Sequence, residues 1–251
     1  MISQHLDAVD RRDASHDRYC IDSDFSPNPV RRHDGHSTEY WTDQRIQRSG
    51  RFQYHVYSKA RRLAQETKAR TIVDVGCGVG TKLQKFFGNG IRAIGIDTPE
   101  SITICQRLFP DGSWLSDDFE NPTINERGIR LEPDIIVCAD VIEHLERPER
   151  LMDYLASLAS SETLLVLSTP DRERSEGKDT HCPTNKEHVR EWSGDEFATF
   201  VQYSGWELIE HQVLLPFRLR LDRMSASYIR GRVRSWLPLK TCQVIVGRRS
   251  T

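Results

Sequence analysis

The sequence lacks the features of membrane-embedded and secreted proteins. No apolar run in the chain approaches the roughly twenty residues that a membrane-spanning helix needs. Its first residues carry neither the basic start nor the apolar segment of a signal peptide. The six cysteines include no C-x-x-C pair, so reduced thiols fit better than a disulfide framework. We therefore expect a soluble, cytoplasmic protein.

A charge excess of one sign is also missing. The net charge is -2 and the isoelectric point is near 6.5, which argues against binding nucleic acid over the whole surface. No internal repeat, low-complexity tract or dividing linker interrupts the 251 residues. These absences favour one compact domain at 51–251, preceded by a polar N-terminal arm or lid at 1–50. Aromatics at the end of that arm, Tyr40 and Trp41, either pack on the domain or close over a substrate.

The most informative segment is residues 71–80, which reads T-I-V-D-V-G-C-G-V-G. Four β-forming residues carry one acid, Asp74, into three glycines at alternate positions. This pattern predicts a buried parallel strand that ends in a turn of bare backbone, where a nucleotide-like ligand can bind. Dinucleotide folds use G-x-G-x-x-G, whereas Thr81 stands here in place of their last glycine.

A second apolar segment, residues 93–97, ends in an acid about twenty residues beyond the glycines. At the tip of a parallel strand, the Asp97 carboxylate can accept both hydroxyls of a ribose. The alternative role for Asp97 is a helix N-cap, since Pro99 follows it. This acid therefore indicates a nucleoside without identifying it.

A later apolar segment, residues 134–139, breaks at Asp140 and is followed by V-I-E-H-L. Together, D-x-G-x-G-x-G at 74–80 and A-D-V-I-E-H-L at 139–145 resemble motifs I and IV of class I S-adenosylmethionine (AdoMet)-dependent methyltransferases. The resemblance is to the small-molecule branch of that family, which includes enzymes of quinone biosynthesis. It extends over roughly residues 52–215.

The resemblance implies an AdoMet site along one edge of the sheet. It assigns Asp97 to the ribose and Asp140 to the methyl-donor pocket. Asp118 and Phe119 are assigned to the adenine, with Asp117 as a close alternative. The remaining residues of the implied cofactor site are those of the first motif: Asp74, Gly76, Gly78 and Gly80.

The rest of the chain alternates between helical and strand patterns. Apolar stripes with helical spacing come before the first strand (Phe52, Val56, Ala60, Leu63) and after the fourth (Leu151, Leu155, Leu158). A capping box begins a later helix at Ser193. Further strands are expected at 164–169, 206–215 and 241–246. We therefore predict an α/β fold with a doubly wound, seven-stranded sheet, mostly parallel with a C-terminal antiparallel strand.

Two histidines are candidates for the catalytic base. The sulfonium methyl of AdoMet is already activated, so a hydroxyl acceptor needs mainly alignment and removal of its proton. His144 follows Asp140 closely, and His188 lies in N-K-E-H-V-R-E-W-S, which resembles a segment of the acceptor pocket in the same family. Either histidine could instead cap or pack. No D-P-P-Y or N-P-P-Y follows the fourth strand, which favours oxygen over nitrogen as the acceptor atom.

No metal site is expected. His181, Cys182 and His188 are close in sequence, but they lack a second ligand cluster at zinc-finger spacing. The acceptor is expected to be a small molecule or a glycan. The sequence specifies neither that acceptor nor an oligomeric state.

One segment departs from the average charge. Residues 217–238 interleave arginines with apolar side chains between the last two strands. A solvated helix face is its simplest interpretation. The alternatives are contact with an anionic substrate, with a membrane surface that carries a lipid-linked intermediate, or with RNA phosphates.

Three other functions remain open. A catalytically silent AdoMet-binding module would bind the cofactor without turnover, and an RNA methyltransferase would use the arginine segment. An NAD-dependent reductase is disfavoured by Thr81 and by the lack of a Tyr-x-x-x-Lys pair after the fourth strand.

Overall fold

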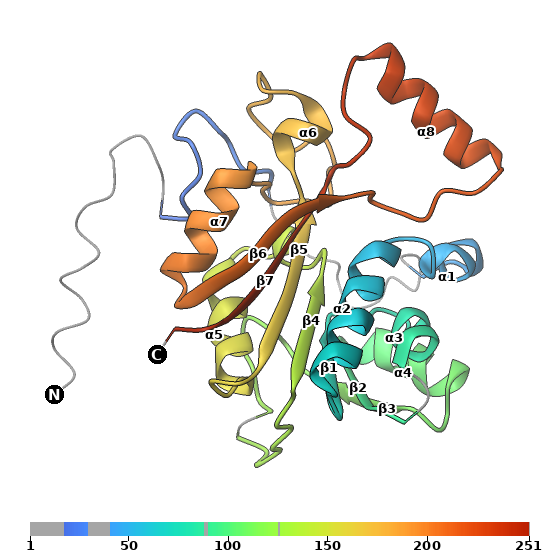
Figure 1. The fold of residues 1–251 in the computed structure, drawn as a ribbon, viewed down its shortest axis with the longest axis vertical. Helices are drawn as coiled ribbons and strands as arrows, with labels where there is room; N and C mark the ends of the chain where they lie inside the picture. The colour runs from blue at the N-terminus through green and yellow to red at the C-terminus, as the bar shows by residue number, and fades with distance from the viewer. Residues whose placement is uncertain (1–17, 30–40, 88–89, 125, 251) are drawn as a thin grey trace, which may run out of the picture.

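The computed structural model describes residues 18–29, 41–87, 90–124 and 126–250. Its centre is one seven-stranded sheet with the order β3-β2-β1-β4-β5-β7-β6 (Figure 1). The first five strands pair in parallel, whereas β7 runs antiparallel to both β5 and β6. The α/β fold, the mixed sheet and the C-terminal antiparallel strand are therefore confirmed.

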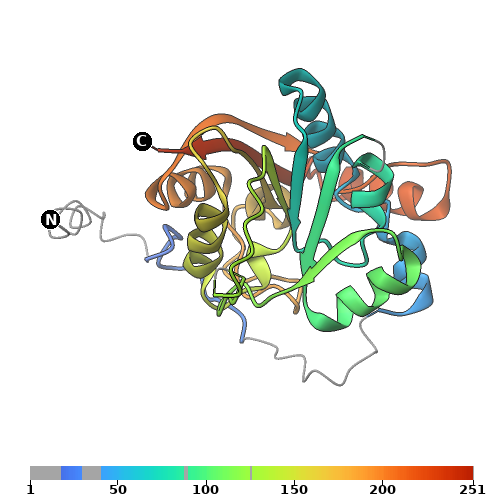
Figure 2. The same ribbon diagram turned by 90° about the horizontal axis from the view of Figure 1, so that it is seen from below.

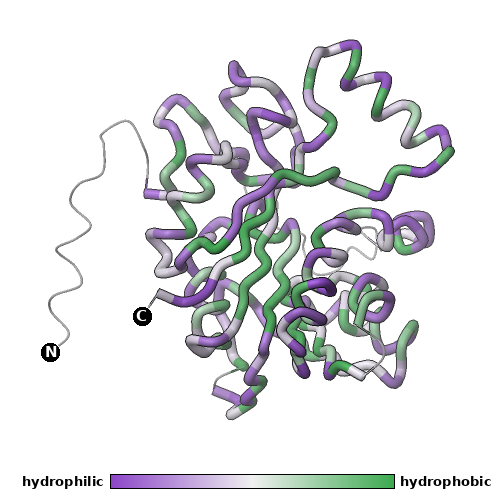
Figure 3. The backbone as a smooth tube through the Cα atoms, in the orientation of Figure 1, coloured by the Kyte–Doolittle hydropathy of each residue, from purple (hydrophilic) through white to green (hydrophobic). Residues whose placement is uncertain are grey.

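The strands lie close to their predicted positions. They are β1 (Thr71–Val75), β2 (Arg92–Asp97), β3 (Ser113–Ser116), β4 (Ile135–Ala139), β5 (Leu164–Pro170), β6 (Trp206–Leu214) and β7 (Cys242–Arg249). All five residues of β4 are buried. Strands in the middle of the sheet are largely hydrophobic along their length (Figure 3), because helices cover both of their faces.

The helices form two layers, one on each face of the sheet (Figure 2). One layer comprises α2 (Tyr54–Thr67), α3 (Thr81–Phe87) and α4 (Pro99–Leu108), and the other comprises α5 (Pro148–Leu158) and α7 (Gly194–Tyr203). Val56 and Ala60 of α2 pack with β1 and β4 in one apolar core. Leu151 and Leu155 of α5 pack in the other core. Phe52 lies outside the predicted stripe, because α2 begins after it and its side chain is exposed.

Shorter helices lie near the carboxyl ends of the strands. They are α1 (Asp43–Ser49), the 3₁₀ turn η1 (Ile142–His144) and α6 (Arg172–Glu176). The predicted capping box is present at the start of α7, where Ser193 and Glu196 exchange hydrogen bonds. No helix in the described ranges is long and apolar enough to cross a membrane.

The N-terminal arm is described only in part. Tyr19, Ile21 and Phe25 are buried in the same core as α5 and α7. Tyr40 lies outside the described residues, as does the extreme N-terminus. Whether the arm moves as a lid stays a prediction.

The arginine segment projects from the body as α8 (Arg223–Arg234), between β6 and β7 (Figure 1). Its attachment runs through Phe217, which pairs with Phe52 in an isolated bridge. Arg51 closes the same junction by an ion pair with Asp222 at 2.7 Å. The helix is therefore held at its base and directed outward.

Candidate functional site

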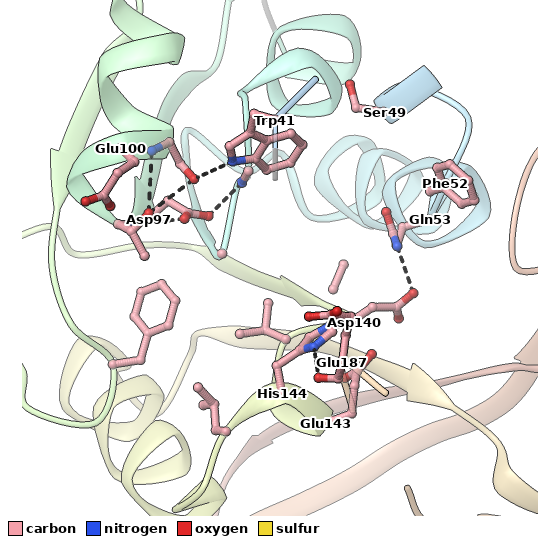
Figure 4. Close-up of a pocket in the computed structure, with 18 of the residues that line it drawn as sticks. Trp41, Ser49, Phe52, Gln53, Asp97, Glu100, Asp140, Glu143, His144 and Glu187 are labelled. Atoms are coloured by element: carbon pink, nitrogen blue, oxygen red, sulfur yellow. Dashed lines mark hydrogen bonds between the residues drawn. The ribbon is translucent and has the colours of Figure 1, made fainter. Parts of the chain in front are cut away.

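A cavity of about 1450 Å³ opens at the carboxyl edge of the sheet. It lies beyond the ends of β1, β2, β3 and β4, where a doubly wound sheet places its ligand. Asp97 and Trp41 lie at one end of this cavity, and Asp140, Glu143 and His144 lie at the other (Figure 4). Helix α1 and Gln53 complete the wall between them.

The glycine turn after β1 presents bare backbone to the cavity. Gly76 and Gly78 line it with φ of +81° and +58°, in the left-handed region that favours glycine. A Cβ atom on Gly76 would lie 2.2 Å from Val141 Cγ2, so no side chain fits there. Gly80 is not among the lining residues, and a Cβ on it would lie 2.4 Å from the Trp114 ring. Gly80 therefore lets the Trp114 ring pack against the turn, and a contact between Gly80 and the cofactor stays a prediction.

Asp97 faces the cavity from the end of β2. Its Oδ2 accepts the backbone N–H of Gly78 at 2.7 Å, and its Oδ1 accepts that of Thr98 at 2.8 Å. The N-cap of α4 is Thr98, so Asp97 does not perform the alternative capping role. Burial raises the pKa of Asp97, against the effect of those two N–H donors. Each carboxylate oxygen keeps a lone pair for a ligand hydroxyl.

Asp74 lies beneath the cavity, fully buried in β1. Both of its oxygens accept the Tyr57 hydroxyl, at 3.0 and 2.8 Å. Burial raises the pKa of Asp74 to about 7, while the Tyr57 hydrogen bond and the nearby Lys82 oppose that rise. Burial lowers the pKa of Lys82 in turn. Asp74 therefore supports the glycine turn from below, and direct contact with a cofactor stays a prediction.

The two acids after β3 differ in their surroundings. Asp117 is buried, and its oxygens accept the backbone N–H groups of Thr123 and Ile124 at 2.8 and 3.1 Å. Asp118 is exposed at the cavity rim, where it caps a local turn through the N–H of Glu120. Both carboxylates therefore accept hydrogen bonds from the loop, since Asp118 Oδ2 also accepts the Asn121 side-chain amide at 3.2 Å. Asp118 is the more exposed of the two, and its contact with adenine stays a prediction. Phe119 lines the cavity beside it.

Asp140 connects three segments at the end of β4. Its Oδ1 accepts the Ser168 hydroxyl at 2.6 Å, and its Oδ2 accepts the Gln53 amide at 2.9 Å. Its backbone φ is +53°, a conformation that non-glycine residues adopt at a cost. This geometry joins the start of α2 to β4 and β5 at the cavity wall.

The two histidines predicted from separate motifs lie together. The ring centroids of His144 and His188 are 4.8 Å apart, with the rings nearly perpendicular. His144 Nδ1 contacts the carbonyl oxygen of Glu187 at 2.8 Å, and His188 Nδ1 contacts the Glu191 carboxylate. Burial lowers the pKa of His144. Burial also lowers the pKa of His188, but the Glu191 hydrogen bond and nearby carboxylates outweigh it and raise the pKa overall.

Glu143 was overlooked among the sequence candidates, although it directly precedes His144. It is fully buried, and its Oε2 accepts the Thr169 hydroxyl at 3.0 Å. Burial and the nearby Asp140 raise the pKa of Glu143 to about 8. The acid next to His144 in A-D-V-I-E-H-L was the available signal. By contrast, the structure does not bring His181 or Cys182 into the group that contains His188.

Trp41 is a second residue that sequence patterns did not assign to the cofactor. Its indole N–H donates to Ser101 Oγ at 3.1 Å, so that the segment before α1 contacts α4. Its ring would lie 3.2 Å from a Cβ on Gly78. The aromatic thus lies over the glycine turn.

A comparison with protein families identifies this architecture. Residues 24–211, well over half of the chain, match the model of a methyltransferase domain. The chain belongs to this methyltransferase family. The resemblance drawn from the glycine and A-D-V-I-E-H-L motifs is thereby confirmed.

Curated relatives of this methyltransferase include ubiquinone biosynthesis O-methyltransferases. The relative from Nitrobacter winogradskyi is 28% identical over 101 residues, which is 40% of this chain and 39% of the relative. One from Rhodopseudomonas palustris is 30% identical over the same length, 40% of each chain. The similarity spans about two fifths of these relatives.

Solved structures show the same fold. The methyltransferase bound to the Trm112 activator of Haloferax volcanii superposes with a TM-score of 0.64 at 15% identity, over 85% of this chain and 96% of that one. The plantazolicin methyltransferase superposes with a TM-score of 0.55 at 18% identity, over 83% and 88%. At these identities the likeness concerns the fold alone.

Proposed function

We propose that this methyltransferase transfers the methyl group of AdoMet to an oxygen of a small molecule or a glycan intermediate. The observation that carries the proposal is the bare backbone of Gly76 and Gly78 beside the Asp97 carboxylate, in one cavity with His144 and His188. The glycine backbone can bind the amino-acid end of AdoMet, and the Asp97 carboxylate can bind its ribose. The imidazoles at the other end of the cavity can take the proton that an acceptor hydroxyl must lose.

The cofactor assignments follow the cavity wall. Asp97 holds the ribose, and Asp118 and Phe119 hold the adenine. The methionine end lies over Gly76 and Gly78, with Asp140 next to it. The names of the curated relatives support oxygen as the acceptor atom.

The chemical step is an in-line displacement. The acceptor oxygen attacks the methyl carbon, the S–CH₃ bond breaks, and S-adenosylhomocysteine leaves with the electron pair. The acceptor proton passes to a base, for which His144 and His188 are the nearest candidates. The chain needs to align the reactants and exclude water, and the walled cavity supports both roles.

Calorimetry with three ligands tests the cofactor. We expect AdoMet and S-adenosylhomocysteine to bind with dissociation constants of roughly micromolar order, and NAD not to bind. NAD binding would instead support the reductase. An acceptor panel of phenols, catechols and glycans, scored by release of S-adenosylhomocysteine, then separates an enzyme from an AdoMet-binding scaffold module. Turnover on RNA oligonucleotides alone would move the proposal to an RNA methyltransferase.

A further inference from the structure

Three side chains of the metal-ligand type meet at the acceptor end of the cavity. Ligand atoms of Glu143, His144 and His188 all lie within 4.8 Å of one another, and all three residues line the cavity. We propose that this group binds one divalent metal ion. The inference replaces the sequence-based expectation that the chain has no metal site.

The hydrogen bonds around the two imidazoles orient them as ligands. The Glu187 carbonyl can only accept, so His144 Nδ1 carries the proton and its Nε2 bears a lone pair. The Asn185 amide oxygen accepts a backbone N–H at 3.1 Å, so the Asn185 amide nitrogen donates to His188 Nε2 at 2.8 Å. His188 Nδ1 donates to Glu191. Carbonyl and carboxylate partners on Nδ1 are typical of metal-binding histidines.

Glu143 supplies the carboxylate ligand. Its Oε1 is buried and has no hydrogen-bond partner within the described part of the chain. A buried acceptor left unsatisfied is costly, and a cation would satisfy it. The ion would also take the lone pair of His144 Nε2, and it would displace the Asn185 amide from His188 Nε2. Two imidazoles and one carboxylate suit a first-row transition metal such as Zn²⁺ or Mn²⁺. Three protein ligands also leave a coordination position for a substrate oxygen.

The catalytic consequence rests on the proposed function, whereas metal binding does not. A hydroxyl bound to the ion loses its proton to water more readily, because the cation stabilises the oxyanion. The oxyanion then attacks the methyl carbon as the S–CH₃ bond breaks. In this arrangement His144 and His188 hold the ion instead of acting as bases.

Metal titration of the chelator-stripped full chain tests the site. We expect one equivalent of Mn²⁺ or Zn²⁺ by calorimetry, and with Co²⁺ a visible absorption band from imidazole coordination. Glu143→Gln and His188→Asn are each expected to weaken binding at least tenfold, a loss typical of disturbed metal sites. His181→Asn is the matched control, because His181 is exposed and outside the group.

Binding of S-adenosylhomocysteine shows that each variant is folded and keeps the cofactor site. If Glu143→Gln does not fold, His144→Asn serves in its place. A wild-type chain that binds no ion, or variants that bind it as tightly as His181→Asn does, would overturn the inference. Failure of AdoMet binding with an intact metal titration would instead count against the proposed function alone.

A different observation concerns α8, whose outward faces are unusually apolar and cationic. Ile229 and Val233 lie one turn apart on the helix, and Trp236 follows its C-terminal end with a positive φ of 54°. Val233 and Trp236 are 66% and 95% exposed. Leu221, just before the helix, is fully exposed. On the inner side, Tyr228 packs on Phe217. The exposed apolar residues therefore belong to a surface that the body does not cover.

The adjacent face of α8 carries arginines. Arg223, Arg230 and Arg234 are exposed, and none forms an ion pair with any residue that the structure describes. By contrast, Arg232 donates to the carbonyl groups of Arg174 and Ser175 on α6 and fixes the helix in place. Exposed apolar side chains beside free cations, on a helix and at its ends, are typical of segments that lie in a membrane interface.

We infer that α8 docks on an anionic lipid surface. Charge complementarity selects anionic headgroups, and the exposed Val233 and Trp236 select a bilayer over a dissolved anion. The segment that carries α8 begins beside the cavity, because Pro216 and Phe52, the bridge partner of Phe217, both line the cavity. Docking would therefore bring the cavity mouth close to a lipid-embedded acceptor.

Sedimentation with vesicles tests the surface. We expect the chain to bind phosphatidylglycerol-containing vesicles, and neutral phosphatidylcholine vesicles much less. Arg230→Gln and Arg234→Gln should each weaken binding about fivefold, and Val233→Ser with Trp236→Ser should weaken it further. Tyr203→Ser is the control, because Tyr203 is an exposed aromatic on α7. Equal binding by all variants, or binding to inorganic phosphate or RNA that does not need Trp236, would contradict the inference.

Discussion

Replacement of Asp97 tests the cofactor site at one residue. Its carboxylate already holds the Gly78 and Thr98 N–H groups at 2.7 and 2.8 Å, so its position is fixed before the ligand arrives. Two hydroxyl hydrogen bonds to a charged group contribute about 3 to 6 kcal/mol together. Asp97→Ala should therefore weaken binding of S-adenosylhomocysteine by roughly a hundredfold to ten-thousandfold.

Calorimetry on the purified chain measures this change, and circular dichroism shows whether the variant is folded. Asp97→Asn keeps one acceptor oxygen and should fall between wild type and Asp97→Ala. Asp153→Ala, on the exposed face of α5, is the control. A folded Asp97→Ala chain that binds the ligand within about threefold of wild type would refute the ribose assignment, since even one charged hydrogen bond is worth more.

Further predictions concern the turn and the buried acid below it. Gly80→Ala should cost about 2 to 4 kcal/mol in denaturant titrations, because its Cβ would collide with Trp114. Gly205→Ala, at a site with positive φ but open space, should cost only about 1 kcal/mol, and an equal loss at both sites would exclude the collision. Because the pKa of Asp74 is raised to about 7 in the folded chain, its neutral carboxyl stabilises the fold at low pH. That stabilisation is lost as the pH rises through about 7. Asp74→Asn should therefore gain stability relative to wild type between pH 5 and pH 8, and a constant difference would contradict this. Tyr57→Phe should reduce the free energy of unfolding by about 1 kcal/mol, and no change would show that the Asp74 contact is unimportant.

Much of the fold could be predicted because its determinants are local. The buried parallel strands have continuous apolar runs, as in β4, and their ends carry the acids that identify the ligand edge. Positive φ at Gly76 and Gly78 follows from the same short motif. The start of α2 was less predictable, because the apolar Phe52 continues the helical spacing but pairs with Phe217 outside it.

The contacts that complete the cavity depend on distant segments. Gln53 meets Asp140 across 87 positions, and Trp41 meets Ser101 across 60, with no local pattern to indicate either pair. His188 lies beside His144 only because the loop after β5 returns to the end of β4. Asp117 is buried whereas Asp118 is exposed, a difference that adjacent positions in the sequence do not indicate.

A crystal structure of the chain with S-adenosylhomocysteine tests the central claim most directly. We predict that the ligand lies in the cavity with its amino-acid end over the backbone of Gly76 and Gly78. Its ribose hydroxyls should lie within hydrogen-bond distance of Asp97. A ligand bound elsewhere, or a cavity that instead takes a phosphate-bearing molecule at the glycine turn, would contradict the account.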